Sequence, residues 1–212
     1  MKTTIFLGFS LLILTFLILS VPFQSCEPDE EEKMVYKPNI YIYPNEVIDL
    51  TLKITFPMGG KIVTSIPEYG SGWSFVVDTS GLIDNTYSYL FYESIQPDVW
   101  QRNYGWCIKT DTLEIFIRQN MSEYGFNDKE INDFIEYWIP RLNDYPYYSL
   151  YPQTNCIIDD VVQLEFSKQP ENILRLFYSI HGRNSFMDKL KSPTIDKFIR
   201  EGYFVTEWGV IL

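Results

Sequence analysis

Three charged residues stand inside strings of aromatic residues: Glu93, Arg141 and Glu207. Because tyrosine or tryptophan lies close to each of them in sequence, each side chain is expected to be partly removed from water, where a charge needs a partner. A glycosidase uses two carboxylic acids at one site, so Glu93 and Glu207 could hydrolyse a glycosidic bond. The alternative is a structural ion pair between Arg141 and Glu207, which perturbs charges without chemistry.

Aromatic side chains are candidates for binding rather than catalysis. Phe, Trp and Tyr make up 17% of the chain. Their flat apolar faces and polar edges suit a sugar ring or a protein partner. Together with the charged residues, the candidate ligand-binding residues are Trp73, Glu93, Arg141, Tyr147, Tyr148, Tyr151, Glu207 and Trp208. The alternative is that the tryptophans belong to the core, which is the expectation for Trp106 and Trp138.

The segment 145–152 concentrates tyrosines between two prolines. Because proline disfavours regular strand pairing, we predict a loop that displays Tyr147, Tyr148 and Tyr151 to a ligand. The alternative is that this loop folds back and covers an edge of the core.

No metal site and no cofactor site is predicted. The sequence lacks Gly-x-Ser-x-Gly, His-Glu-x-x-His and a phosphate-binding glycine loop. His181 could be a general base, but the residues that follow it are typical of a turn. One histidine and few thiols argue against zinc. Cys107 and Cys156 could form a disulfide in an oxidising compartment, or could remain two buried thiols.

The N-terminus has the plan of a secretory signal. A positive start at Lys2 precedes an apolar run over residues 5–23, with Ser25 and Cys26 directly after it. The pair Ser25-Cys26 resembles a lipobox of the Bacteroidota type, so residues 1–25 are predicted to be a signal peptide and Cys26 the lipidated residue. An uncleaved apolar anchor is the alternative, because the run is nearly long enough to span a bilayer.

An acidic segment follows Cys26 and is predicted to be a tether over residues 26–36. It resembles the signal that sends lipoproteins to the outer face of the outer membrane, so the expected location is the cell surface, with periplasmic retention as the alternative. The net charge of −11 disfavours nucleic-acid binding, which needs clustered Lys and Arg. The remaining residues, 37–212, suit one domain.

Hydrophobic periodicity predicts a single α+β domain with a largely antiparallel sheet and a packed helix pair. Alternation predicts strands in the first half and again near the C-terminus, and apolar residues at helical spacing predict two helices between them. Gly125 is expected to end the first helix, and Asn127 with Glu130 to begin the second. The predicted strands are 39–43, 48–56, 61–66, 73–78, 87–93, 161–166, 173–180 and 203–211, and the predicted helices are 111–124, 127–140 and a short one at 193–200.

Several strings resemble those of a family of uncharacterised microbial proteins. Residues 37–44, KPNIYIYP, resemble its opening KPVIYLYP, and residues 87–93, YSYLFYE, resemble its YSYLFWE. Further similar strings are Gly105-Trp106, residues 132–142 and Glu207-Trp208-Gly209. The resemblance implies a shared fold and no activity.

These observations predict an exported, lipid-anchored envelope protein. We expect a binding or interaction module for a carbohydrate or an envelope protein. A cell-envelope hydrolase with paired carboxylates and a purely structural envelope role are the alternatives.

Overall fold

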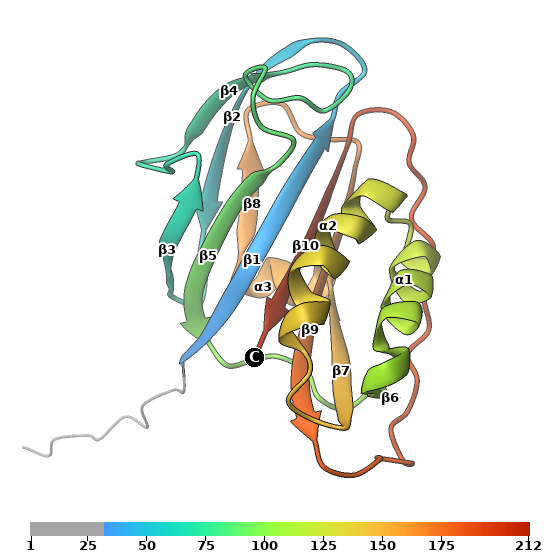
Figure 1. The fold of residues 1–212 in the computed structure, drawn as a ribbon. Helices are drawn as coiled ribbons and strands as arrows, with labels where there is room; N and C mark the ends of the chain where they lie inside the picture. The colour runs from blue at the N-terminus through green and yellow to red at the C-terminus, as the bar shows by residue number, and fades with distance from the viewer. Residues whose placement is uncertain (1–31) are drawn as a thin grey trace, which may run out of the picture.

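The computed structural model describes residues 32–212, so the predicted signal peptide, Cys26 and the first part of the tether lie outside the described residues. The described chain forms three layers: a pair of helices, a large sheet and a small sheet (Figure 1). The prediction of one α+β domain with mostly antiparallel strands and a packed helix pair is confirmed.

The large sheet has seven strands in the order β3-β5-β1-β10-β9-β7-β6. Neighbouring strands are antiparallel except β9 and β10, which are parallel because the long connection 184–203 returns the chain to the starting end of β9. The last strand, β10, is paired on both sides, since it lies between β1 and β9. The strands are β1 (Glu32–Tyr43), β3 (Lys61–Ile66), β5 (Leu90–Pro97), β6 (Trp106–Lys109), β7 (Tyr147–Thr154), β9 (Asn172–Arg183) and β10 (Phe204–Ile211).

The small sheet is antiparallel and consists of β4 (Trp73–Val77), β2 (Ile48–Thr55) and β8 (Gln163–Phe166), in that order. Its central strand alternates as the sequence predicts: Leu50, Leu52 and Ile54 are buried, whereas the residues between them face water. The turn 57–60 therefore connects two different sheets rather than two paired strands.

Helices α1 (Leu113–Tyr124) and α2 (Asp128–Trp138) cover the face of the large sheet opposite the small sheet (Figure 1). Gly125 ends α1 with φ at 114°, a left-handed conformation that glycine adopts without strain. Asn127 caps α2: its side chain accepts from the Glu130 amide at 2.9 Å, and the Glu130 carboxylate accepts from the Asn127 amide at 2.8 Å. Both predictions about the helix ends are confirmed.

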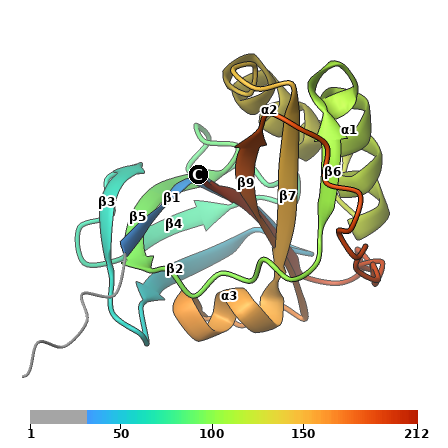
Figure 2. The same cartoon turned by 90° about the horizontal axis from the view of Figure 1, so that it is seen from below.

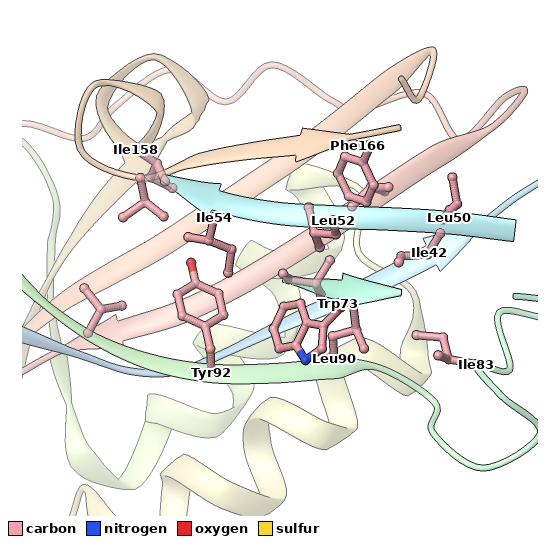
Figure 3. Packing of buried hydrophobic residues seen from close by; sticks show 14 of the residues in the cluster. Ile42, Leu50, Leu52, Ile54, Trp73, Ile83, Leu90, Tyr92, Ile158 and Phe166 are labelled. Atoms are coloured by element: carbon pink, nitrogen blue, oxygen red, sulfur yellow. The ribbon is translucent and has the colours of Figure 1, made fainter. Parts of the chain in front are cut away.

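Two cores result from these layers. Between the two sheets, one core packs Leu52 and Trp73 against Leu90 and Tyr92 (Figure 3). The other lies between the large sheet and the helix pair, and Phe134 and Trp208 are at its centre. The short helix α3 (Asn155–Val161), which periodicity did not predict, covers the end of the inter-sheet core with Ile158 (Figure 2). Most aromatic side chains of the described residues lie in these two cores or pack against them.

The structure corrects the expected loop at 145–152. Residues 147–154 form β7, an interior strand between β9 and β6. Its proline is tolerated because Pro152 lies beyond Leu150, the last residue of β7 that pairs with β6, so one side of the strand has no neighbour there.

Three further expectations are wrong. Residues 193–200 form no helix; they follow the surface of the domain, where the Phe198 amide donates to the Tyr124 carbonyl. Strand β1 begins at Glu32, so the end of the expected tether belongs to the domain. Cys107 is buried and Cys156 exposed, and both thiols are free, so neither the disulfide nor the pair of buried thiols is present.

Within residues 32–212, no helix is both long and apolar enough to cross a membrane.

Candidate functional site

The site begins with an irregularity in β1. The pairing of this strand shifts between Tyr36 and Asn39 on the β10 side and between Val35 and Asn39 on the β5 side. Lys37, inside this bulge, has φ at 51°, a left-handed conformation that is uncommon for a residue with a side chain. A bulge redirects a side chain that regular alternation would place elsewhere. Here it directs Lys37 toward α2 and the face that the helices cover.

The Lys37 ammonium lies over three aromatic rings from two elements. Its Nζ is 5.4 Å from the ring centre of Tyr89, 4.9 Å from that of Phe91 and 4.7 Å from that of Tyr137. Tyr89 directly precedes β5, Phe91 belongs to β5, and Tyr137 belongs to α2. Ring faces attract a cation, but they do not satisfy its N–H donors as oxygen acceptors do.

Lys37 makes no ion pair with any described residue. Burial lowers the pKa of its ammonium, the carboxylates of Asp133 and Glu93 raise it, and the Arg141 guanidinium lowers it. The net effect is a pKa below the ordinary value. The ammonium is therefore half-buried, and the carboxylates of Asp133 and Glu93 act on it without pairing with it. This favours a negatively charged partner.

Two more cations lie around the same rings. Lys129 donates to Asp133 at 2.8 Å and lies 5.5 Å from the ring centre of Tyr89. The guanidinium of Arg141 stacks on Tyr137, with its central carbon 3.8 Å from the ring centre. Both side chains are largely exposed.

A pocket of about 410 Å³ opens at this place. It is bounded by the bulge, by the segment 86–91 and by Tyr137 of α2. Three of the family-like strings, residues 37–44, 87–93 and 132–142, meet here although they are far apart in sequence. The residues that line it are Lys37, Ile66, Thr86, Tyr87, Ser88, Tyr89, Phe91 and Tyr137.

Of the residues that the sequence predicted, Glu93 and Arg141 belong to this region. Both act on the pKa of Lys37. The expected ion pair between Arg141 and Glu207 is not formed, because Arg141 is exposed and stacked on Tyr137.

Glu207 instead pairs with Arg175 on the other face of the large sheet. The Arg175 Nε donates to a Glu207 carboxylate oxygen at 2.6 Å, and the Tyr92 hydroxyl donates to the other oxygen at 2.9 Å. Tyr92 belongs to the inter-sheet core, whereas Phe91, of the same parity in β5 as Glu93, faces the Lys37 pocket. Glu93 and Glu207 therefore lie on opposite faces of the sheet and cannot flank one glycosidic bond.

The remaining predicted residues serve the cores. Trp73 is buried between the sheets, and its indole N–H donates to the Pro67 carbonyl at 2.9 Å. Trp208 is fully buried beneath α2. In β7, Tyr148 and Tyr151 are buried, and Tyr147 is half-buried against Phe186. None of these rings is displayed as a platform for sugar.

The sequence reasoning missed Lys37, Tyr89, Phe91 and Tyr137 as site residues. The signal that could have found them is the lysine at the start of an aromatic string, since a charge in such a string needs a partner as much as Glu93 does. Their convergence, however, depends on the pairing of β1 with β5 and on the docking of α2.

No protein-family model, no curated protein and no solved structure matches this chain. Among the described residues, no group of three His, Cys, Asp or Glu side chains is arranged to hold a metal ion.

Proposed function

We propose that this protein is a lipid-anchored binding module of the cell envelope that takes an acidic carbohydrate in the Lys37 pocket. The observation that carries the proposal is the half-buried Lys37 ammonium, held over three rings with no ion pair among the described residues.

The cation supports an acidic ligand. Its three N–H groups can donate to a carboxylate or sulfate, and such hydrogen bonds are stronger than those to neutral oxygens. Arg141 adds positive charge at the rim, where Lys129 is paired with Asp133, although the chain as a whole has a net charge of −11. Local charge therefore favours an anion that the rest of the surface would repel.

The pocket lining supports a sugar as the carrier of that charge. Tyrosine rings combine an apolar face with a hydroxyl, and Tyr87 and Tyr89 stand beside Thr86 and Ser88, which offer further hydrogen bonds. We extend the proposal to the N-terminus: residues 1–25 direct export, and lipid on Cys26 holds the domain at the outer face of the outer membrane. Surface display suits a module that captures glycans.

A hydrolase built on Glu93 and Glu207 finds no support, because the large sheet separates them. We therefore propose a class of ligand and no reaction.

The test measures binding by the chain from residue 26 onward carrying Cys26→Ser, which contains every described residue. An oligosaccharide with uronic acids should bind, and the same oligosaccharide with its carboxyl groups reduced to alcohols should bind at least about tenfold more weakly, because one charged hydrogen bond is worth about 1.5–3 kcal/mol. Lys37→Met keeps the aliphatic stem and should cause a similar loss.

Lys53→Met is the matched control, because Lys53 is exposed on β2 in the small sheet. Equal binding of the acidic and reduced oligosaccharides, or an unchanged affinity in Lys37→Met, would overturn the proposed ligand class.

A further inference from the structure

A second group of basic side chains lies on the face of the large sheet opposite α1 and α2. It consists of His181 and Arg183, at the end of β9, and Arg102, on the connection from β5 to β6 that runs across the molecule (Figure 2). None of these three residues lines the Lys37 pocket.

Among residues 32–212, no carboxylate pairs with Arg183. Its Nε donates to the Ser149 hydroxyl at 3.1 Å and its Nη2 to the Tyr151 hydroxyl at 3.3 Å, and both acceptors are neutral. Within residues 32–212, the other half-buried or buried guanidinium groups pair with carboxylates: Arg102 with Asp98, Arg175 with Glu207 and Arg200 with Glu130.

His181 lies beside the Arg102 guanidinium. Its Nε2 accepts from the Arg102 Nε at 3.2 Å and lies 3.0 Å from the Ser179 hydroxyl. Burial, Arg102 and Arg183 lower the pKa of His181, Asp98 raises it and Lys33 lowers it. Asp98 pairs with Arg102, so the Arg183 guanidinium is the charge of this group whose hydrogen-bond partners among residues 32–212 are all neutral.

The donors of this group fit an oxyanion. The planar guanidinium of Arg183 has five N–H donors in a fork that matches two oxygens of one anion, and its Nη1 makes no hydrogen bond with a described residue. Among the residues that the structure describes, the Ser149 hydroxyl donates only to the thioether of Met187, at 3.4 Å, which is a weak acceptor that a charged oxygen would replace. A protonated His181 would supply another donor.

We propose that Arg183, Ser149 and His181 bind a phosphate group at this end of the large sheet. Phosphate is preferred over a carboxylate because its larger number of oxygens matches the guanidinium fork, the hydroxyl and the imidazole together. Free phosphate and the headgroup of a phospholipid share this chemistry. The headgroup is relevant because β1 begins at Glu32 and Lys33 acts on the pKa of His181, so the cluster lies where the domain joins the N-terminal segment.

The single histidine of the chain makes the test direct, because one imidazole signal in a proton NMR spectrum belongs to His181. With the chain from residue 26 onward carrying Cys26→Ser, its pKa is measured in inorganic phosphate and in chloride at equal ionic strength. Bound phosphate favours the imidazolium, so the pKa of His181 should be higher in phosphate.

Arg183→Gln should weaken phosphate binding about tenfold or more, since it removes one charged donor group. Arg183→Lys keeps the charge without the fork and should bind with intermediate affinity. Arg118→Gln is the matched control, because this exposed arginine of α1 pairs with Glu114 far from the cluster. The control should respond to phosphate as the unchanged chain does.

An equal pKa of His181 in phosphate and chloride would overturn the proposal, as would a phosphate response that Arg183→Gln retains in full. The source of the phosphate is then separated with vesicles: Arg183-dependent binding to phosphatidylglycerol over phosphatidylcholine indicates a headgroup, and a response to inorganic phosphate without vesicle binding indicates a free ligand. Both patterns support the site. Neither depends on the carbohydrate pocket.

Discussion

Arg175 and Glu207 form the most deeply buried ion pair among the described residues, with exposed side-chain fractions of 1% and 0%. They lie on the neighbouring strands β9 and β10, directly opposite each other, at the edge of the inter-sheet core. Two buried charges are tolerated here because the Tyr92 hydroxyl donates to Glu207 and the Arg175 Nη1 donates to Asp159. This network is structural, and it explains why a glutamate appears in an otherwise apolar C-terminal strand.

Replacing one partner of this pair should be severe. Arg175→Met leaves Glu207 buried without its cation, so we expect a loss of about 3–5 kcal/mol in the free energy of unfolding, measured by urea denaturation. Arg141→Met is the comparison, because Arg141 is exposed and stacked on a single ring. Equal stability of the two variants would contradict the assignment of Arg175 as the buried partner.

His181 should make stability depend on pH. Because burial and the neighbouring arginines lower its pKa in the folded state, its contribution is fully present above about pH 6.5, the ordinary histidine value, and is lost as the pH falls through the lowered pKa. Urea denaturation at a series of pH values between 7.5 and 5 should show decreasing stability, measured at low phosphate. In His181→Gln this decrease should be smaller, and an identical slope in both proteins would assign it to other groups.

At the scale of the elements, Glu130 connects the start of α2 to three other parts of the chain. It caps its own helix and accepts hydrogen bonds from Tyr43 of β1 and Thr206 of β10, at 2.8 and 2.7 Å. Arg200 of the connection 184–203 pairs with it at 2.9 Å. The helix is thus fastened to the centre of the sheet by one fully buried carboxylate.

This predicts two different costs within one capping box. Asn127→Ala should destabilise the protein by about 1 kcal/mol, the ordinary cost of losing an N-cap. Glu130→Ala should cost about 3–5 kcal/mol, because it leaves the Arg200 guanidinium without its carboxylate and also removes one half of the cap. Both are measured as free energies of unfolding, and similar costs for the two variants would show that the contacts of Glu130 beyond its helix contribute little.

Residues 145–152 were predicted to form a loop because they contain two prolines, but most of them belong to strand β7. Tyr148 is buried under the helix pair, so Tyr148→Ser should lower the free energy of unfolding by about 3 kcal/mol or more, as for other large core aromatics. Tyr147→Ser should cost clearly less, since Tyr147 is only half-buried. Thermal denaturation of both variants checks this, and a stable Tyr148→Ser protein would place that ring outside the core.

At the scale of the whole molecule, the two proposed sites lie on opposite faces of the large sheet. The carbohydrate pocket is on the side of α2, and the phosphate cluster is on the other side, near the start of β1. The two proposed ligands would therefore approach the domain from opposite faces of the large sheet.

The anchor itself is tested by the cysteine. Cys26→Ala should abolish labelling with a radioactive or clickable fatty acid and should block processing of the signal, because lipidation and cleavage both need that thiol. Cys156→Ala is the matched control, since Cys156 is an exposed free thiol of the folded domain. Unchanged labelling of the Cys26→Ala protein would remove the lipoprotein proposal.

Local pattern determined much of this architecture in advance. The alternation in β2, the glycine that ends α1 and the cap formed by Asn127 and Glu130 all follow from contacts between residues close in sequence, so the sequence alone was sufficient to predict them. Alternation likewise predicted the C-terminal strand.

Only the tertiary structure decided which distant residues meet. The division into two sheets, the interior place of β7 and the choice of Arg175 rather than Arg141 as the partner of Glu207 depend on strand order and register, which local periodicity does not encode. The Lys37 pocket is the clearest case, because a bulge in β1 turns one lysine toward rings supplied by β5 and α2. The identity of these residues can be read from the sequence, but their convergence results from long-range packing.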